Sequence, residues 1–216
     1  MFTGIIENMG QVKEISATGT NKTFWITSPL SGSFKVDQSI SHNGVCLTVE
    51  ETGEGMHRVT AVEETLKRTN LNQWQPGTRI NLERSLLPES RLDGHFVQGH
   101  VDATGVLKKI REKQGSHELE FRFPKKLAAL VIEKGSISIN GVSLTAFDVK
   151  KDAFKVAVIP YTFEHTNLQY LKENDEVNLE FDMIGKYTAS FEDRPRSISG
   201  FLYNSQVVQV TRESVV

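Results

Sequence analysis

The chain contains one pattern twice, and this duplication constrains its fold more than any other feature. The segment from Ser39 to Thr48 reads SISHNGVCLT, and 97 residues later the segment from Ser136 to Thr145 reads SISINGVSLT. The two copies differ at only two aligned positions, His42 against Ile139 and Cys46 against Ser143. A repeat of this length predicts one structural unit built twice in tandem.

Further matches extend the repeat in both directions. The same spacing carries Thr65, Thr69, Asn70 and Leu71 onto Thr162, Thr166, Asn167 and Leu168, and Asn81, Leu82 and Glu83 onto Asn178, Leu179 and Glu180. Near the start a spacing of 95 carries Gly4, Gly10 and Ile15 onto Gly99, Gly105 and Ile110. We therefore predict a first unit over residues 1–96, a second over 97–186 and a tail over 187–216.

Each unit shows the alternation of half-buried β-strands. Apolar residues recur at every second position in residues 23–27, 79–83 and 118–123, with Asn and Gly between such stretches. Several short strands in fewer than 100 residues favour a small closed barrel, because closure removes exposed strand edges. The prediction is an all-β protein of two tandem antiparallel barrels, with short helices expected near residues 65–71, 162–171 and 125–133.

The tail leaves the repeat after about Gly185. Residues 188–196 are polar and interrupted by Pro195, so any helix there should be short. The alternating stretch 206–211 is expected to form either an added strand or a partly ordered end.

Charge and cysteine content narrow the class of protein. The 25 Lys and Arg balance 27 Asp and Glu, for a net charge of −2, so the chain lacks the basic bias of a nucleic-acid or anionic-membrane binder. The start lacks a secretory pattern, and no apolar run approaches the roughly 20 residues that span a bilayer. The single cysteine fits a reducing compartment, and we expect a cytoplasmic location.

The repeated Asn-Gly segment admits a purely structural interpretation, a hairpin turn followed by a core strand. Both copies nevertheless keep small polar residues beside the turn, namely Ser39, Cys46 and Thr48 in the first and Ser136, Ser143 and Thr145 in the second. On a strand, positions 46 and 48 share one face, and so do 143 and 145, which suggests that they line a site.

A second polar cluster lies at the junction of the units. His95 and His100 stand five residues apart, on opposite faces of a regular strand, without carboxylate or cysteine at a familiar ligand spacing, so no metal is expected. His100 occupies the position that Ile5 holds in the first copy, and this difference suggests that the two units divide the work.

Cys46 has three interpretations: a catalytic nucleophile, a small buried residue, or a residue lining a site, which we favour. The signatures of α/β-hydrolases, phosphate-binding loops and dinucleotide-binding folds are missing from the sequence.

Together these motifs resemble the riboflavin synthase family. The resemblance rests on Met1 to Glu7, Asn43 to Thr48, Gly94 to Asp102 and Asn140 to Thr145, and it covers about residues 1 to 187 in order. It implies two six-stranded Greek-key barrels, each binding 6,7-dimethyl-8-ribityllumazine. It also implies a homotrimeric transferase without cofactor, in which one lumazine passes a four-carbon unit to another to yield riboflavin and 5-amino-6-ribitylaminouracil.

The resemblance also assigns the site residues. It implies a first ligand site of Gly4, Ile5, Ile6, Cys46, Leu47, Thr48, Thr60, Ala61, Val62, Glu63, Glu64 and Thr65. It implies a second of Gly99, His100, Val101, Lys134, Ser143, Leu144, Thr145, Ile159, Pro160, Tyr161, Thr162, Phe163 and Glu164.

For the chemistry, His100 is the expected proton-transfer group, because the ordinary pKa of histidine lies near neutrality. Ser39, Cys46 and Ser143 are expected as polar partners of the pteridine rings, and Asp182 and Lys134 as further contacts. The last two have structural alternatives, since Lys134 can be a solvated turn residue and Asp182 can cap a helix in the tail.

The tail departs from the family pattern, whose usual amphipathic C-terminal helix is replaced by a short polar region and an extension. Non-catalytic relatives that bind lumazine or flavin as an optical antenna are the main alternative function, and a duplicated structural barrel is a third. An association with lumazine synthase is left open by the sequence.

Overall fold

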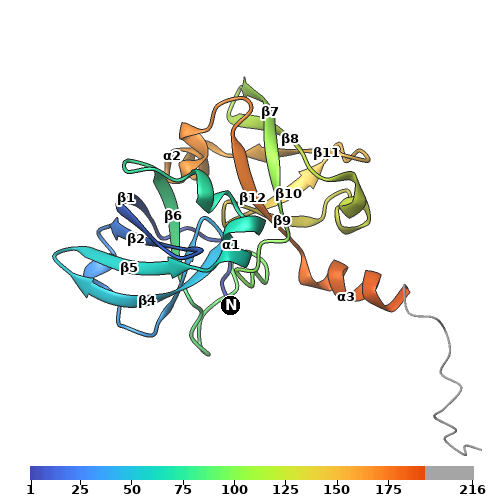
Figure 1. Cartoon of the computed structure of the whole chain (residues 1–216). Coiled ribbons are helices and arrows are strands. Elements are labelled where there is room, and N and C mark those ends of the chain that lie inside the picture. Colours follow the sequence, from blue (N-terminus) through green and yellow to red (C-terminus); the bar gives the residue numbers. More distant parts are fainter. Residues whose placement is uncertain (193–216) are drawn as a thin grey trace, which may run out of the picture.

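Two closed six-stranded barrels form the molecule, each covering one copy of the repeat (Figure 1). The computed structural model describes residues 1–192. The first barrel comprises β1 (Asn8–Thr18), β2 (Asn21–Thr27), β3 (Ser39–His42), β4 (Val45–Gly53), β5 (Met56–Ala61) and β6 (Arg79–Arg84). The second comprises β7 (Ala103–Lys113), β8 (Ser116–Arg122), β9 (Ser136–Ile139), β10 (Val142–Phe147), β11 (Ala153–Val158) and β12 (Glu176–Phe181).

Both barrels have the same topology, and all of their strand pairs are antiparallel. The order around the first is β1-β2-β5-β4-β3-β6, and the equivalent strands of the second follow in the same order. Alternate residues of each strand fill the interior, as the period of two predicts; on β2 the buried residues are Phe24 and Ile26, and on β8 Leu119 and Phe121. The all-β, two-barrel prediction is confirmed.

Short helices join the strands close to the predicted segments. The α-helices are α1 (Glu63–Arg68), α2 (Pro160–Glu164) and α3 (Met183–Glu192). The 3₁₀ turns are η1 (Ser31–Ser33), η2 (Asn70–Gln73), η3 (Lys125–Leu130) and η4 (Asn167–Tyr170). Thr69 and Thr166 interrupt the two predicted helical segments because each is extended and accepts a hydrogen bond from the N–H two residues later.

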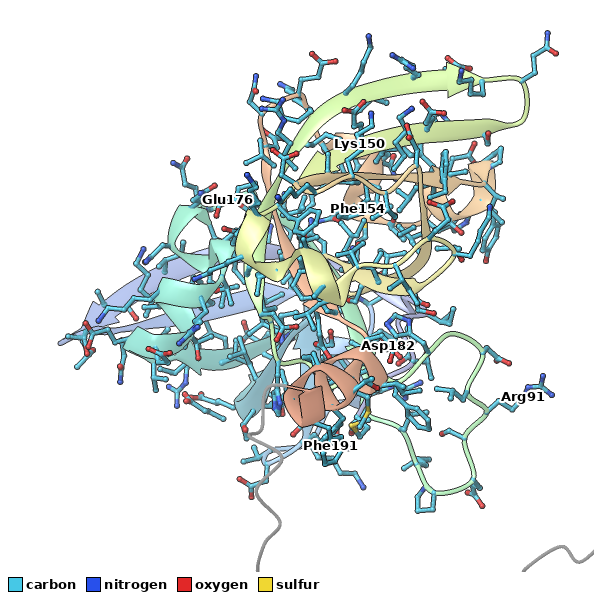
Figure 2. The ribbon with its side chains drawn as sticks, turned by 90° about the vertical axis from the view of Figure 1, so that its right-hand side faces the viewer. Arg91, Lys150, Phe154, Glu176, Asp182 and Phe191 are labelled. Carbon is cyan, nitrogen blue, oxygen red and sulfur yellow. The ribbon has the colours of Figure 1, made fainter. Side chains whose placement is uncertain are left out.

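Helix α3 is short, as predicted, but its surface is not polar. Ile184, Tyr187 and Phe191 lie three to four residues apart and are 59–67% exposed. The helix projects from the second barrel, and Figure 2 shows it running from Asp182 to Phe191. The predicted boundary between barrel and tail, at residue 187, falls inside this helix, and the alternating stretch 206–211 lies outside the described residues.

The two Asn-Gly turns of the repeat meet between the barrels. A Cβ atom placed on Gly44 would lie 2.8 Å from the backbone nitrogen of Gly141, and one on Gly141 would lie 2.8 Å from that of Gly44. Asn43 and Asn140 precede these glycines with φ of 49° and 47°. The turns therefore need glycine because their backbones touch, which the hairpin interpretation of each copy alone does not predict.

Buried asparagines join the barrels around these turns. The Asn81 Nδ2 donates to the Asn140 carbonyl across the interface, and the Asn178 Nδ2 donates to the Asn43 carbonyl, each at 2.9 Å. The Asn81 Oδ1 also accepts from the Asn167 N–H at 2.7 Å. Because these amides are buried, each unmade bond would cost more than a bond at the surface.

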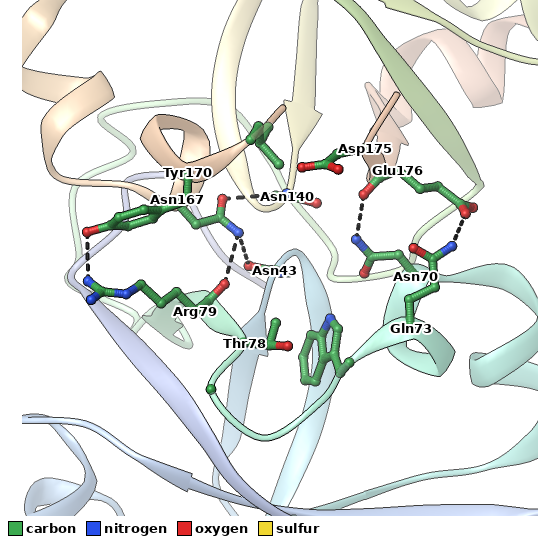
Figure 3. Close-up of a pocket in the computed structure, with 13 residues that line it drawn as sticks. Asn43, Asn70, Gln73, Thr78, Arg79, Asn140, Asn167, Tyr170, Asp175 and Glu176 are labelled. Carbon is green, nitrogen blue, oxygen red and sulfur yellow. Dashed lines mark hydrogen bonds between the residues drawn. The ribbon is translucent and has the colours of Figure 1, made fainter. Parts of the chain in front are cut away.

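A polar pocket of about 370 Å³ opens beside this network and is lined by residues of both barrels (Figure 3). Equivalent residues of both repeats face it, but their side chains differ at the rim, where Arg79 corresponds to Glu176 and Gln73 to Tyr170. The Arg79 guanidinium lies 4.5 Å from the centre of the Tyr170 ring and donates to its hydroxyl at 2.7 Å. Gln73 donates to Glu176, so the rim also links the barrels.

Candidate active site

A pocket of about 270 Å³ on the first barrel collects several predicted residues. Its lining combines β4, α1 and the segment after the first barrel: Val45, Cys46, Glu64, Thr65, Arg68, Thr69, Gly99, His100 and Val101. Of these, Val45, Arg68 and Thr69 are not among the site residues predicted from the sequence. The volume lies near the lower end of ligand sites, roughly 300 Å³. The pocket therefore offers a thiol, an imidazole and a hydroxyl to a small ligand.

The opening segment of the second repeat closes this pocket. The Cys46 N–H donates to the Gly99 carbonyl at 2.9 Å, so the peptide lies directly on strand β4. Gly99 has a φ of 80°, and a Cβ there would lie 2.5 Å from the Cys46 Cβ. Glycine is needed at this position both for its conformation and for the close contact, and the next residue, His100, is thereby placed at the pocket.

The second barrel repeats this arrangement with the start of the chain. The Ser143 N–H donates to the Gly4 carbonyl at 2.8 Å, and a Cβ on Gly4, whose φ is 78°, would lie 2.6 Å from the Ser143 Cβ. The two opening segments also pair with each other, because Phe2 and Val97 exchange backbone hydrogen bonds of 2.7 and 3.1 Å.

The structure groups the predicted residues differently from the grouping that the resemblance implies. Gly99, His100 and Val101 lie on the first barrel with Cys46, and Gly4 lies on the second with Ser143. The residues that open each repeat complete the other barrel's site. The bridge between Phe2 and Val97 holds the two opening segments side by side at the junction of the barrels.

The Ser143 hydroxyl, which is equivalent to the Cys46 thiol, has a histidine partner. The His95 Nδ1 lies 2.6 Å from the Ser143 Oγ, and the His95 N–H donates to the Thr3 carbonyl at 3.1 Å. Burial lowers the pKa of His95, while the charge of Asp182 acts in the opposite direction. From the sequence, His95 was examined only as a possible metal ligand. Its contact with Ser143, 48 residues away, has no counterpart in the local residue pattern.

Other predicted residues of the first barrel lie around the pocket rather than in it. Ser39 pairs with Thr48 across β3 and β4, whereas Ser41 is the residue opposite Cys46. The Thr60 hydroxyl lies 2.8 Å from that of Thr23, and Ala61 is fully buried.

Helix α1 contributes only part of its predicted set. Val62 precedes the helix and is half exposed. Glu63 pairs with Lys67 at 2.6 Å, and Glu64 pairs with Arg68 at 2.7 Å.

The equivalent residues of the second barrel present a broader exposed surface. Ile159 and Tyr161 are 58% and 68% exposed, and Pro160 begins α2. The Phe163 ring stacks on His117 with 3.7 Å between ring centres, and the Thr162 carbonyl accepts from Thr166. The remaining predicted residues of this barrel are Leu144, which packs against the core, Thr145, which is exposed on β10, and Glu164, whose carbonyl accepts from Gln169.

Lys134 and Asp182 have local structural roles. Lys134 is exposed in a turn with a φ of 62°, and its Nζ lies 5.9 Å from the centre of the Phe147 ring. The Asp182 Oδ1 accepts from the Ile184 N–H at 3.0 Å, so Asp182 caps α3. Asp182 and Ser136 also line a largely apolar pocket of about 410 Å³ between η3 and α3. Binding and catalytic roles for the predicted residues stay predictions.

Two absences describe the part of the chain that the structure covers. Within residues 1–192, His, Cys, Asp and Glu side chains form no group of three or more that could hold a metal ion. In the same range, no helix combines the length and apolar character needed to cross a membrane.

Comparisons with known proteins agree with this architecture. The lumazine binding domain family matches the chain twice, over residues 3–85 and 98–182. A riboflavin synthase of Actinobacillus pleuropneumoniae is 37% identical over 203 residues, which cover 91% of this chain and 94% of the relative. One of Mycobacterium tuberculosis is 40% identical over 192 residues, covering 87% and 96%. This chain belongs to the riboflavin synthase family.

Solved structures give the same fold. LumP in complex with riboflavin superimposes with a TM-score of 0.78 at 25% identity, covering 84% of this chain and 99% of LumP. The riboflavin synthase family thus shares its pair of lumazine-binding barrels with this binding protein, and the resemblance stated from the sequence is confirmed.

Proposed function

We propose that this chain is a riboflavin synthase that converts two molecules of 6,7-dimethyl-8-ribityllumazine into riboflavin and 5-amino-6-ribitylaminouracil. One observation carries the proposal: two related sites occur on one chain, and each is completed by the opening segment of the other repeat. A reaction that consumes two copies of one substrate needs two similar sites. The products together contain all atoms of the two substrates, so the exchange needs no outside oxidant or reductant.

Positioning and proton transfer are the tasks left to the protein. Aligned reactants can lower the barrier by several kcal/mol, on the order of 7 or more, and a placed acid or base adds roughly a hundredfold or more in rate. His100 stands at the pocket of the first barrel beside Cys46, where it can accept or return a proton of the 7-methyl group of a bound lumazine. In the second barrel Ser143 and His95 offer hydrogen bonds to the partner ring.

The assembly that we propose is a homotrimer, in which a first-barrel site faces a second-barrel site of another subunit. The pocket of about 270 Å³ is open, so a lumazine bound there keeps one face available for the second. The apolar side chains of Ile184 and Tyr187 on α3, with Ile132 nearby on the second barrel, offer the contact surface. Replacing Ile184 and Tyr187 by Asp should lower the mass measured by light scattering from that of a trimer to that of a monomer. The lone, unpaired Cys46 supports a cytoplasmic location.

The deciding experiment mixes the purified chain with 6,7-dimethyl-8-ribityllumazine, without added metal or nucleotide, and follows the visible absorption of riboflavin. Accumulation of riboflavin is the expected result. A shift of the lumazine spectrum without turnover would favour a ligand-binding protein, the alternative left open by the likeness to LumP, which was solved in complex with riboflavin. Absence of binding would refute both functions.

A further inference from the structure

Two buried glutamates hold the segments that complete the sites. Glu83 on β6 and Glu180 on β12 occupy equivalent positions in the two repeats, and they are 4% and 2% exposed. The Glu83 carboxylate accepts from the N–H and hydroxyl of Thr3 at 2.6 and 2.7 Å and from the Gly4 N–H at 3.0 Å. The carboxylate of Glu180 is held in the same way.

Glu180 receives three consecutive backbone N–H groups. They belong to Gln98, Gly99 and His100, at 2.5, 2.9 and 2.8 Å from its oxygens. The positive φ of Gly99 turns successive N–H groups toward one anion, as in the concave backbone sites that bind anions elsewhere. Hydrogen bonds to an ionised carboxylate are stronger than those between neutral groups, so the segment is fixed from this side.

The opposite side of each segment lies on the other barrel. The Gly99 carbonyl accepts from Cys46 of the first barrel, although the glutamate behind Gly99 belongs to the second. The Gly4 carbonyl likewise accepts from Ser143 of the second barrel, whereas Glu83 belongs to the first. Each segment is therefore clamped between a carboxylate of one barrel and the ligand site of the other.

We propose that Glu180 and Glu83 are crossed positioning residues: Glu180 of the second barrel sets the geometry of the first-barrel site, and Glu83 of the first barrel sets that of the second-barrel site. The inference rests on the proposed function in taking these sites to bind lumazine and riboflavin. Neither carboxylate touches the ligand; each acts through the backbone that it holds.

The protonation chemistry of the glutamates agrees with this role. Backbone N–H groups face both carboxylates, and the Thr3 hydroxyl joins them at Glu83, so the ionised form, whose two oxygens only accept, matches this set of donors best. Burial raises the pKa of both carboxyls, and the hydrogen bonds from the held segments act against that rise. A glutamine in either place would turn one N–H donor toward another.

The test compares Glu180→Gln with Glu83→Gln, each variant serving as the matched control of the other. Cys46 lies in the first-barrel pocket, so protection of its thiol from iodoacetamide by riboflavin reports that site alone. We expect E180Q to raise the riboflavin concentration for half-protection ten- to hundredfold, and E83Q to change it less than threefold. Both variants should lower kcat/KM for the lumazine tenfold or more.

Three outcomes would overturn the inference. In the first, E83Q and E180Q weaken the protection of Cys46 by riboflavin equally. In the second, E83Q weakens it more than E180Q does. In the third, both variants keep the protection and the kcat/KM of the unchanged chain and only unfold at a lower temperature. If E180Q does not fold, Glu180→Asp keeps the charge while withdrawing it by one methylene, and the same crossed pattern is then expected at smaller amplitude. The proposed function is tested separately by turnover of the unchanged chain, because the Cys46 measurement needs only that riboflavin binds.

Discussion

A buried histidine pair in the first barrel should make the stability of the protein fall steeply in mild acid. His42 and His57 are fully buried, and their Nε2 atoms lie 2.9 Å apart. The His42 Nδ1 lies 3.0 Å from the Ile40 carbonyl, and the His57 Nδ1 lies 2.8 Å from the Ser31 hydroxyl. All three contacts are satisfied at once if His42 donates to Ile40, His57 donates to His42 and Ser31 donates to His57, with both rings neutral.

The magnitude follows from linkage between protonation and unfolding. Burial lowers the pKa of His57 from 6.5 to about 4, and burial together with the neighbouring ring lowers that of His42 well below its ordinary value. Because both rings take up protons more readily when unfolded, the native state keeps its full stability above about pH 6.5 and loses it as the pH falls toward 4. His57 alone should account for about 3 kcal/mol of this loss.

The second barrel supplies a matched control. At the positions of Ser31, His42 and His57 it carries Ala128, Ile139 and Phe154, of which the last two are fully buried in its core. The triple variant S31A/H42I/H57F therefore introduces a side-chain set that this topology already packs. Urea unfolding of both proteins between pH 7.5 and 4.5 should show the larger decrease in unfolding free energy in the unchanged chain.

A direct measurement can contradict the reasoning. Nuclear magnetic resonance of the ring protons should find His57 still neutral in the folded protein at pH 5.5. A ring that titrates near pH 6.5 without unfolding, or equal decreases in stability for the unchanged and triple-variant proteins, would refute the argument.

Three further predictions concern the site and the interface. Gly99→Ala adds a Cβ at 2.5 Å from that of Cys46, so kcat/KM should fall about a hundredfold while the unfolding free energy in urea falls by less than about 3 kcal/mol. His100→Gln removes the imidazole proposed for proton transfer but keeps a polar side chain; kcat should fall roughly a hundredfold or more, with riboflavin affinity in calorimetry changed far less. Asn81→Ala leaves buried polar groups of both barrels without partners and should lower the unfolding free energy by about 1–3 kcal/mol in urea titrations.

Each of these has an outcome that would contradict it. Wild-type turnover in G99A would mean that the backbone at residue 99 does not set the site. A kcat for H100Q within threefold of the unchanged chain would remove His100 from proton transfer. An N81A protein as stable as the parent would mean that the asparagine network contributes nothing net to the interface.

Local residue patterns were sufficient for the architecture. The duplication, the period-two strands and the Asn-Gly turns predict two similar closed barrels, because β-strand periodicity and glycine conformation are properties of short segments. The same patterns align Cys46 with Ser143 and place His100 where the first repeat has Ile5.

Contacts between distant segments were not accessible in this way. Gly4 and Gly99 open the two repeats, and each bonds to a glutamate of its own repeat, so nothing in the local sequence indicates that each also contacts the other barrel. In the structure Phe2 pairs with Val97, the segment with Gly99 bonds to Cys46 of the first barrel, and the segment with Gly4 bonds to Ser143 of the second. The structure therefore brings the predicted segments together in another combination than the sequence analysis expected, while their binding roles stay predictions.

The sequence by itself thus determined the repeat, the barrel class and the family, since all three depend on residue order along the chain. Tertiary structure alone decided which segments share a site, that Glu83 and Glu180 anchor them, and that His95 contacts Ser143. The physical reason is that these contacts join segments far apart in the chain. The glutamate bonds link the two ends of one repeat and depend on how that repeat folds back, whereas the contacts of Gly99 with Cys46 and of Gly4 with Ser143 depend on how the two barrels dock.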